Sequence, residues 1–236
     1  MKRLARLLII GLMVWPMALL ASGPIKAAAP GIERAAAPID LGDGRLQVGA
    51  IIIDQAKQTF TTPGVTLRRA DPIEFIAVTQ GGHKSYESII ELETNAHDFN
   101  LACILIGLDN SRATRPQRHF DPAPVRGNPV DISISWQQRG ETRTVAAADL
   151  LSVDGKPVTS HRWRYNGSWF GPGGRYKAEE FGTLVGFVHD EDSIIHHREG
   201  LGLDNYGGVK LNEASAPPEG ASVLLTVTRP AAGGAP

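Results

Sequence analysis

The sequence predicts an α+β fold: a largely antiparallel β-sheet assembly with one buried apolar helix. Two observations carry this prediction. Short runs rich in β-branched residues recur between turn-forming residues, and one segment is apolar enough to form a core helix. The chain has 236 residues, with 42% hydrophobic and 21% charged. That composition excludes wholesale disorder and a multi-span membrane protein, and the length fits one large domain.

Six runs are expected to be strands because each is β-rich and bounded by turn formers. The clearest is 130–136, whose strict alternation places apolar side chains on one face and polar ones on the other. Ser222–Thr228 alternates in the same way. Both patterns predict strands of a sheet with one solvent-facing side. The six expected strands are residues 46–54, 73–79, 88–92, 130–136, 183–188 and 222–228.

A hairpin is expected over residues 161–170, where two β-rich runs flank Asn166-Gly167. Asn-Gly tolerates the positive φ angles of a two-residue type I′ turn. Asn166-Gly167-Ser168 also spells a glycosylation sequon, which matters only in a eukaryotic secretory pathway. Residues 110–129, rich in proline and arginine, are expected to form a long surface loop.

One helix stands out after Asn95. Asn95 is suited to cap it, and the charge of Asp98 in the first turn complements the exposed amide groups. Residues 99–108 are then apolar almost throughout. Because a helix that is apolar nearly all round must be covered on most sides, we expect it to lie across the inner face of the sheet as the main core element.

The first 27 residues are typical of a secretory signal peptide. A basic start precedes an apolar stretch at 7–21 and a run of small residues, and cleavage is expected near Ala27. The apolar stretch contains Pro16 and is shorter than the ~20 residues that span a bilayer, so no stable membrane span is expected after cleavage. The expected location is periplasmic or secreted.

The rest of the chain is expected to hold one domain. Residues 28–42, rich in Ala, Pro and Gly, are expected to form a flexible tether, and residues 229–236 a disordered tail. Residues 43–228 between them show no repeat and no second linker of comparable length. They are expected to form the single domain.

Charge and cysteine content exclude several classes of partner and cofactor. Removal of residues 1–27 takes away four basic residues and no acidic ones, so the formal net charge changes from −1 to −5. An acidic protein without a basic run lacks the electrostatic basis for nucleic-acid binding. The single cysteine, Cys103, excludes an intrachain disulfide, an iron–sulfur cluster and a cysteine-rich zinc site, and its aliphatic neighbours predict an inert thiol.

Five segments follow one another in a recognisable order. Residues 81–90 carry Gly-Gly-His-Lys-Ser-Tyr-Glu-Ser before an apolar run, and the helix ends in Leu-Ile-Gly-Leu at 105–108. Further blocks follow at 127–130, 163–168 and 186–190. Together they resemble the YdjY-domain family of exported bacterial proteins. The resemblance covers most of residues 45–228, and because the family has no established activity it implies fold and location more than function.

Two departures from the family pattern matter. Tyr86 stands where relatives carry a histidine, and one extra residue separates Gly82 from Lys84. If the His-Glu pair of relatives performs acid–base chemistry, this chain lacks its histidine. Some relatives also carry a cysteine-rich, ferredoxin-like addition, which a single cysteine excludes here.

Lys84, Tyr86, Glu87 and Ser88 are the first candidate binding residues. Two glycines precede them, which would bring the backbone close to a surface from which alternating polar groups project. The alternative is a turn at a strand edge, stabilised by a Lys84–Glu87 ion pair. A perturbed pKa in a cleft would favour the binding site.

Trp163 and Tyr165 are the second pair of candidates. They share one face of the expected strand and would form an exposed aromatic platform for glycans or peptides. The alternative is burial in the core, the commoner position for large aromatic side chains.

His189, Asp190, Asp192 and His196 form the densest set of potential metal ligands. If Asp192 caps a short helix over residues 193–195, His196 follows four residues later on the same face, a spacing that suits zinc or another divalent metal. The alternative is ordinary capping chemistry at an Asp-rich turn.

The sequence shows no phosphate-binding loop and no nucleophile elbow, and no catalytic residue or resident cofactor is predicted. The leading hypothesis is an exported accessory or binding module for an extracytoplasmic protein, peptide or glycan. The alternative is a metal-dependent hydrolase or oxidoreductase using His189, Asp190, Asp192 and His196. Convergence of the 81–88 and 189–192 turns on one cleft would favour a functional site, whereas positions at opposite ends of the structure would favour the structural alternative for each.

Overall fold

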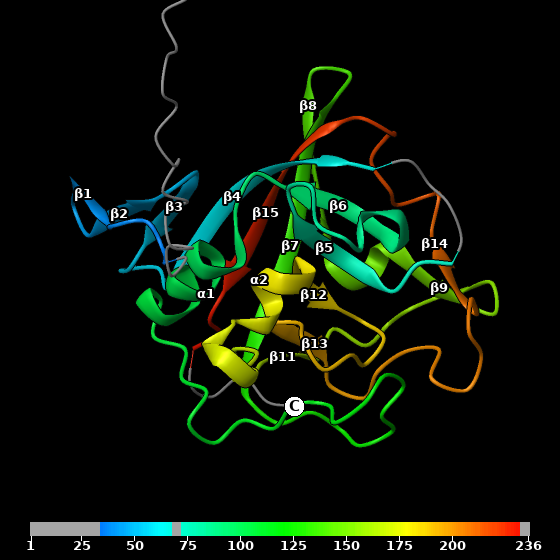
Figure 1. The fold of residues 1–236 in the computed structure, drawn as a ribbon. Helices are drawn as coiled ribbons and strands as arrows, with labels where there is room; N and C mark the ends of the chain where they lie inside the picture. The colour runs from blue at the N-terminus through cyan, green and yellow to red at the C-terminus, as the bar shows by residue number, and fades with distance from the viewer. Residues whose placement is uncertain (1–33, 68–71, 232–236) are drawn as a thin grey trace, which may run out of the picture. The chain divides into compact units, whose positions relative to one another are not determined.

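The computed structural model describes residues 34–67 and 72–231, and in these residues the fold is mostly β (Figure 1). Eight strands form a closed ring in which each pairs with the next and the last returns to the first. In ring order they are β4 (Thr59–Thr66), β15 (Ser222–Thr228), β7 (Asn128–Gln138), β11 (Trp163–Tyr165), β13 (Ile195–His197), β12 (Thr183–Gly186), β5 (Phe75–Thr79) and β6 (Ser88–Leu92). Neighbours are antiparallel except for the parallel pairs β12–β13 and β5–β6.

The expected α+β assembly with one buried helix is therefore wrong. The sheet closes into an eight-stranded barrel, so its inner face is covered by its own opposite wall, and the helices are small. A closed barrel needs no helix across its inner face, because inward-pointing side chains of the strands fill the interior. The largest fully buried side chains are those of Phe60, Phe75, Phe99, Trp163, Tyr165 and Phe187.

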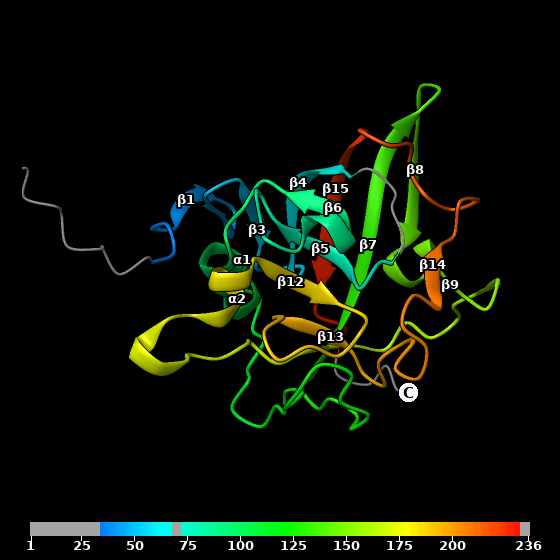
Figure 2. The same ribbon diagram turned by 45° about the vertical axis from the view of Figure 1, so that its right-hand side comes forward.

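Smaller elements attach to the barrel (Figure 2). A hairpin and a third strand extend the sheet beyond β4, β8 pairs with β7, and a separate three-stranded sheet lies in the order β10-β9-β14. These strands are β1 (Ile39–Gly42), β2 (Arg45–Val48), β3 (Ile51–Asp54), β8 (Glu141–Ala146), β9 (Leu151–Val153), β10 (Lys156–Pro157) and β14 (Val209–Leu211). The helices are α1 (Ala96–Leu105), α2 (Lys177–Phe181) and the 3₁₀ turns η1 (Ser85–Glu87), η2 (Ala147–Leu150) and η3 (Pro172–Gly174).

Barrel closure depends on two residues of β4. The β4 edge pairs with β3 as far as Thr61 and with β6 from Gly64 onward, and Pro63 lies between, where a missing N–H removes no ladder bond. At Gly64 a Cβ atom would stand 2.5 Å from the carbonyl oxygen of Glu91 in β6. Only glycine allows the two backbones to approach so closely.

The two alternating runs, 130–136 and 222–228, form barrel strands β7 and β15. In β15 the side chains of Val223, Leu225 and Val227 point inward as expected, and β7 buries its apolar face likewise. The expected single strand at 46–54 is wrong: it is two strands, β2 and β3, joined at Gly49, which has a φ of 56°. A turn there folds the run back on itself.

The helix begins where the sequence predicts. Asn95 caps α1 by accepting a hydrogen bond from the Asp98 amide (2.8 Å), and Glu179 of α2 accepts hydrogen bonds from the amides of Ala96 and His97. It packs against β2, β3, β12 and α2, and among its residues only Ile104 is exposed, at half its surface. Its expected coverage on most sides is confirmed. Its expected position as the main core element across the inner face of a sheet is wrong, because the barrel wall covers that face.

The expected hairpin at 161–170 is also wrong. Trp163–Tyr165 forms β11, but its partners are β7 and β13, and the 168–170 segment forms no strand. The amides of Asn166 and Gly167 both donate to the carbonyl of Ile194, so the Asn-Gly pair binds the β13 side of the barrel instead of turning the chain into a hairpin.

The segment expected to be a tether is described from residue 34, and Ile39–Gly42 within it forms β1. Before that strand, the amide of Ala36 donates to Oδ1 of Asp98 at 2.6 Å. The expected signal peptide (1–27) lies outside the described residues, as does 232–236 of the expected tail. No helix among the described residues is long and apolar enough to cross a bilayer.

Candidate functional site

The Gly81–Ser88 segment folds into a compact turn around η1. Lys84 Nζ donates to Oε1 of Glu87 at 2.6 Å, and the Ser88 hydroxyl donates to the Lys84 carbonyl. Tyr86 points to solvent, with 66% of its surface exposed. Gly82 packs against Gly182 behind α2, where a Cβ on Gly182 would lie 2.7 Å from the Gly82 Cα. The second glycine therefore serves close backbone packing.

Glu74 links this turn to the turn at residues 187–192. Its amide donates to the carbonyl of Glu87 (2.8 Å), and its own carbonyl accepts from the amides of Phe187 and Val188. Glu87 and residues 187–188, which directly precede the 189–192 turn, thus both bond to the backbone of Glu74, next to β5. The pocket described below is lined by Ser88 but by no residue of 189–192, so convergence of the two turns on one cleft stays a prediction.

The Glu74 side chain is buried, and it binds a histidine from a third part of the chain. Oε2 accepts a hydrogen bond from Nε2 of His119 (2.9 Å), whose side chain is 48% exposed. Oε1 is buried and has no hydrogen-bond partner among the residues that the structure describes. A buried polar atom left unpaired costs about 1–3 kcal/mol, so such an atom marks either an ordered water or a functional group.

His119 is placed by the loop that follows α1. The amide of Phe120 donates to the carbonyl of His189 (2.9 Å), and Nδ1 of His189 donates to the carbonyl of Asp121 (2.6 Å). The Phe120 ring lies 4.0 Å from the His119 ring and meets Tyr206 edge to face at 6.0 Å. The loop expected at 110–129 is thus fastened to the barrel at its middle.

Six residues form what we call the Glu74–His119 cluster. They come from four segments: Glu74 before β5, three residues around η1, one residue of the 106–127 loop, and one residue of the loop before β14. Two are buried carboxylates, two are cationic or titratable groups above them, and two are exposed phenols. The members are Glu74, Lys84, Tyr86, Glu87, His119 and Tyr206.

Neighbouring carboxylates raise the pKa values of three residues of the cluster. The hydrogen bond to Glu74 raises the pKa of His119 above its ordinary value, and the charge of Asp190 adds to this. Burial lowers the pKa of Lys84, but the bond and charge of Glu87 outweigh it and raise that pKa overall. Partial desolvation, Glu74 and Glu87 raise the pKa of Tyr206. Shifted pKa values on residues from several segments are typical of functional sites.

The sequence predicts Lys84, Tyr86 and Glu87 as binding residues but not the other three members of the cluster. Glu74 lies in an expected strand, where a lone acid in an apolar run was the available signal. His119 and Tyr206 lie in loops, and their positions depend on tertiary contacts that no local pattern encodes. His119 supplies an imidazole beside Glu74.

The metal-ligand candidates do not form a free donor set. Asp190 Oδ1 accepts from the amides of Asp192 and Ser193, and Oδ2 accepts from the Ser193 hydroxyl and from His196. Both ring nitrogens of His189 lie within hydrogen-bond distance of backbone carbonyl oxygens, those of Asp121 and His197. In the described part of the chain, no three His, Cys, Asp or Glu side chains are grouped so that they could hold a metal ion.

His196 is part of a buried polar network. Ser168 donates its amide to Oδ1 of Asn166, which leaves Nδ2 to donate to Nδ1 of His196 (2.7 Å). The ring proton of His196 then lies on Nε2, which donates to the carbonyl of Asp190 (2.9 Å). The expected helix at 193–195 is wrong, because Ile195–His197 is strand β13. The i, i+4 geometry for zinc is absent.

Asp192 is the half-buried member of this group. Its Oδ1 accepts a hydrogen bond from the Trp169 indole (3.2 Å). Burial, together with the charges of Asp190 and Glu191, raises its pKa to about 6. The carboxyl group therefore titrates close to neutral pH.

The aromatic candidates lie in the core. Trp163 and Tyr165 are each 1% exposed, and the Tyr165 hydroxyl donates to Oδ1 of Asn100. They cannot form an exposed platform, so the alternative interpretation, burial in the core, is confirmed. Asn166 of the sequon is buried too, so its amide is inaccessible for glycosylation.

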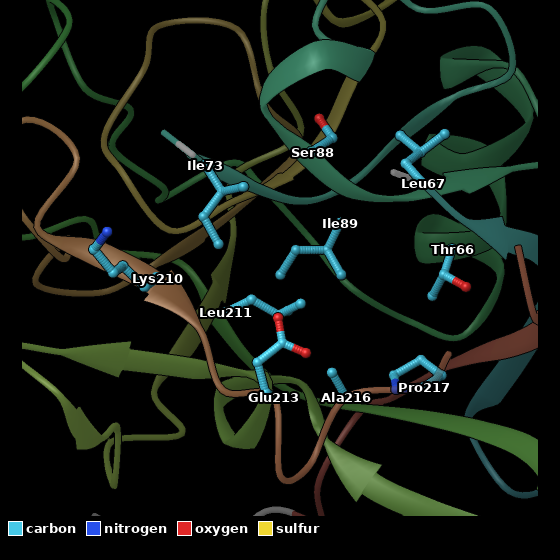
Figure 3. Close-up of a pocket in the computed structure, with 10 residues that line it drawn as sticks. All are labelled: Thr66, Leu67, Ile73, Ser88, Ile89, Lys210, Leu211, Glu213, Ala216 and Pro217. Atoms are coloured by element: carbon cyan, nitrogen blue, oxygen red, sulfur yellow. The ribbon is translucent and has the colours of Figure 1, made fainter. Parts of the chain in front are cut away.

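A pocket of about 290 Å³ lies next to the cluster along the chain (Figure 3). It is lined by Ile73 and Ser88, which adjoin Glu74 and Glu87 in sequence, and by residues of β14 and the segment after it. Figure 3 shows the side chains of Ile73, Ile89 and Leu211 around the space. The lining is mainly aliphatic, which distinguishes it from the polar cluster.

The fold and the site define a closed β-barrel that carries a loop-borne cluster of paired charges and exposed phenols. The family model for the YdjY domain matches residues 51–228, from β3 to β15. The chain belongs to the YdjY-domain family. No curated protein and no solved structure shows a significant match to the sequence.

Proposed function

We propose that this protein is an exported, periplasmic binding module and that the Glu74–His119 cluster is its ligand-contacting surface. The signal-like N-terminal sequence supports export. The observation that carries the binding proposal is Glu74: a buried carboxylate with one unpartnered oxygen, held under a half-exposed histidine. Burying charged groups costs stability, and a structural turn needs no such arrangement.

Export is tested by expressing the full chain in a Gram-negative host and fractionating the cells. The expected result is a periplasmic product whose N-terminus lies near residue 28. Retention of residues 1–27 on a membrane-associated product, or a product confined to the cytoplasm, would contradict export.

Binding is tested by passing a periplasmic extract of the native host over the immobilised mature protein. Wild type is compared with His119→Ala and Tyr206→Ala, which alter the cluster, and with Phe170→Ala, an equally exposed aromatic outside it. The expected result is one component that wild type and Phe170→Ala retain and that both cluster variants lose. Equal retention by all four proteins would show that the cluster is not the binding surface.

The metal-dependent enzyme has less support, because the candidate donors already bind protein groups. Purified mature protein is expected to contain no stoichiometric metal, and its melting temperature is expected to stay unchanged with EDTA. Elemental analysis and thermal denaturation with and without chelator measure both. Stoichiometric zinc together with a lower melting temperature in chelator would favour the enzyme.

A further inference from the structure

We infer that the Glu74–His119 cluster recognises a neutral, hydroxyl-rich ligand of the carbohydrate class. This inference rests on the proposed binding function and narrows it to one class of ligand. Three features of the cluster support it: the layering of its charges, the balance of its donors and acceptors, and the exposed rings beside them.

The charges lie in two layers. The side chains of Glu74 and Glu87 are 3% and 4% exposed, whereas those of His119 and Lys84 are 48% and 32% exposed. Each carboxylate therefore orients one cationic or titratable group from beneath. Lys84 Nζ carries three protons and Glu87 accepts one of them, so donors remain for a ligand.

An anionic ligand fits this arrangement poorly. Each positive group is paired with its own carboxylate, so the cluster has no excess positive charge. An incoming carboxylate or phosphate would therefore find no unpaired cation in the cluster to neutralise its charge.

A cationic ligand fits no better. Lys84 and His119 stand between solvent and the two carboxylates, so an amine would have to displace one of them or approach two like charges. Nor do the carboxylates join other acids in a metal-binding group within residues 34–67 and 72–231. A hydroxyl group both donates and accepts hydrogen bonds, and so it matches neutral ion pairs without a net charge.

The exposed rings supply the apolar part of such a site. Tyr86 and Tyr206 are 66% and 61% exposed. Lys84 Nζ lies 5.8 Å from the centre of the Tyr86 ring, and the charges of Glu74 and Glu87 reach Tyr206 and raise its pKa. Phe120 supports Tyr206 edge to face. A tyrosine combines an apolar ring with a polar hydroxyl, and a pyranose likewise has apolar C–H faces and polar edges. The two surfaces are complementary.

The experiment titrates the mature protein with three kinds of probe while NMR follows the His119 imidazole signal. The neutral probes are maltotriose, chitotriose and mannotriose, the anionic ones are acetate and inorganic phosphate, and the cationic one is putrescine. A saturable shift with at least one trisaccharide, and none with the ions, is the expected result. Tyr86→Ala and Tyr206→Ala are each expected to weaken that binding about fivefold to tenfold, with an unchanged melting temperature, whereas Phe170→Ala binds as wild type does.

The outcomes separate this inference from the proposed function. Saturable binding of phosphate, acetate or putrescine at the cluster, without any trisaccharide response, would overturn the carbohydrate class and leave a binding surface in place. Trisaccharide binding that Tyr86→Ala and Tyr206→Ala both leave unchanged would also overturn it. Silence of the His119 signal with every probe would overturn the carbohydrate class, and the retention experiment with the periplasmic extract then decides independently whether the cluster is a binding surface.

Discussion

At the scale of single residues, the unusual feature is a carboxylate buried under a histidine. Glu74 accepts the hydrogen bond from His119, and its other oxygen is unpaired among the described residues. The buried Glu74 carboxylate lowers the stability of the folded state, and the histidine that it orients is half exposed to solvent. The local environments of His119 and Asp192 each raise the pKa of that group, and each shift predicts a dependence of stability on pH.

The first titration concerns His119, which is expected to have a pKa above 6.5 because Glu74 stabilises the imidazolium. Glu74→Gln removes the charge and keeps the shape, so the pKa of His119 should fall toward or below 6.5. Since the folded-state pKa of His119 is raised, its stabilising contribution is full below the unfolded value and is lost as pH rises through the folded value. NMR titration of the imidazole measures this, with Glu141→Gln in exposed β8 as the matched control.

An unchanged His119 titration in Glu74→Gln would contradict the pairing. So would an equal fall in the Glu141→Gln control.

The second titration concerns Asp192, whose pKa is raised to about 6 from an unfolded value of 3.8. The folded state favours the protonated carboxyl, so the ionised form lowers stability; the penalty grows as pH rises from about 4 to 6 and is full above that range. Asp192→Asn keeps an acceptor for Trp169 and should stabilise the protein at pH 7.5 by about 1–2 kcal/mol after allowance for solvent screening. At pH 4 the gain should nearly vanish.

Urea unfolding at both pH values measures the effect of Asp192→Asn, with Asp204→Asn in an exposed loop as control. A variant that is less stable than wild type at pH 7.5, or equally stabilised at pH 4, would show that burial does not raise this pKa.

At the scale of elements, the decisive contact is the one between β4 and β6 that closes the ring. Residues 222–228 and 130–136 could be assigned from their alternation, and α1 from Asn95, because these signals are local. The closure could not be assigned. β11 and β13 are three residues long and too short for a period, and the partner of each is set by contacts distant in sequence. His119 could not be predicted as a site residue for a similar reason, because the loop that positions it has no periodic sequence pattern.

The close approach of β4 and β6 predicts that one added methyl group at Gly64 lowers the stability of the protein. Gly64→Ala would place a Cβ atom against the backbone of Glu91, and backbone cannot move aside as a flexible side chain can. We expect a loss of about 2 kcal/mol or more, the range found for overpacked sites. Gly140→Asn in the β7–β8 turn is the control, because a Cβ there meets nothing within 4 Å and asparagine tolerates a φ of 83°.

Chemical denaturation compares Gly64→Ala and Gly140→Asn, and hydrogen exchange of the β6 amides shows whether the seam opens. A Gly64→Ala protein as stable as the control, with β6 amides equally protected, would mean that β4 and β6 do not approach as closely as described.

At the scale of the whole described unit, one barrel organises residues distant in sequence into one site. Glu74 joins the β5 and β12 sides of the ring, and the loop after α1 is fastened across them at His189. The sequence indicated the turns at 81–88 and 189–192 separately. That Glu87 and residues 187–188 both bond to the Glu74 backbone is a property of the strand order β13-β12-β5-β6, which no single segment encodes.

The position of β15 in the ring has a consequence for how the chain acquires its fold. β15 pairs along its length with both β4 and β7, yet it follows all the other described strands in chain order. Until residues 222–228 emerge, β4 and β7 each present an open edge, and unpaired edges invite pairing with other chains. The barrel therefore cannot close before residues 222–228 are in place, and the inner strands of the ring stay open to other partners until then.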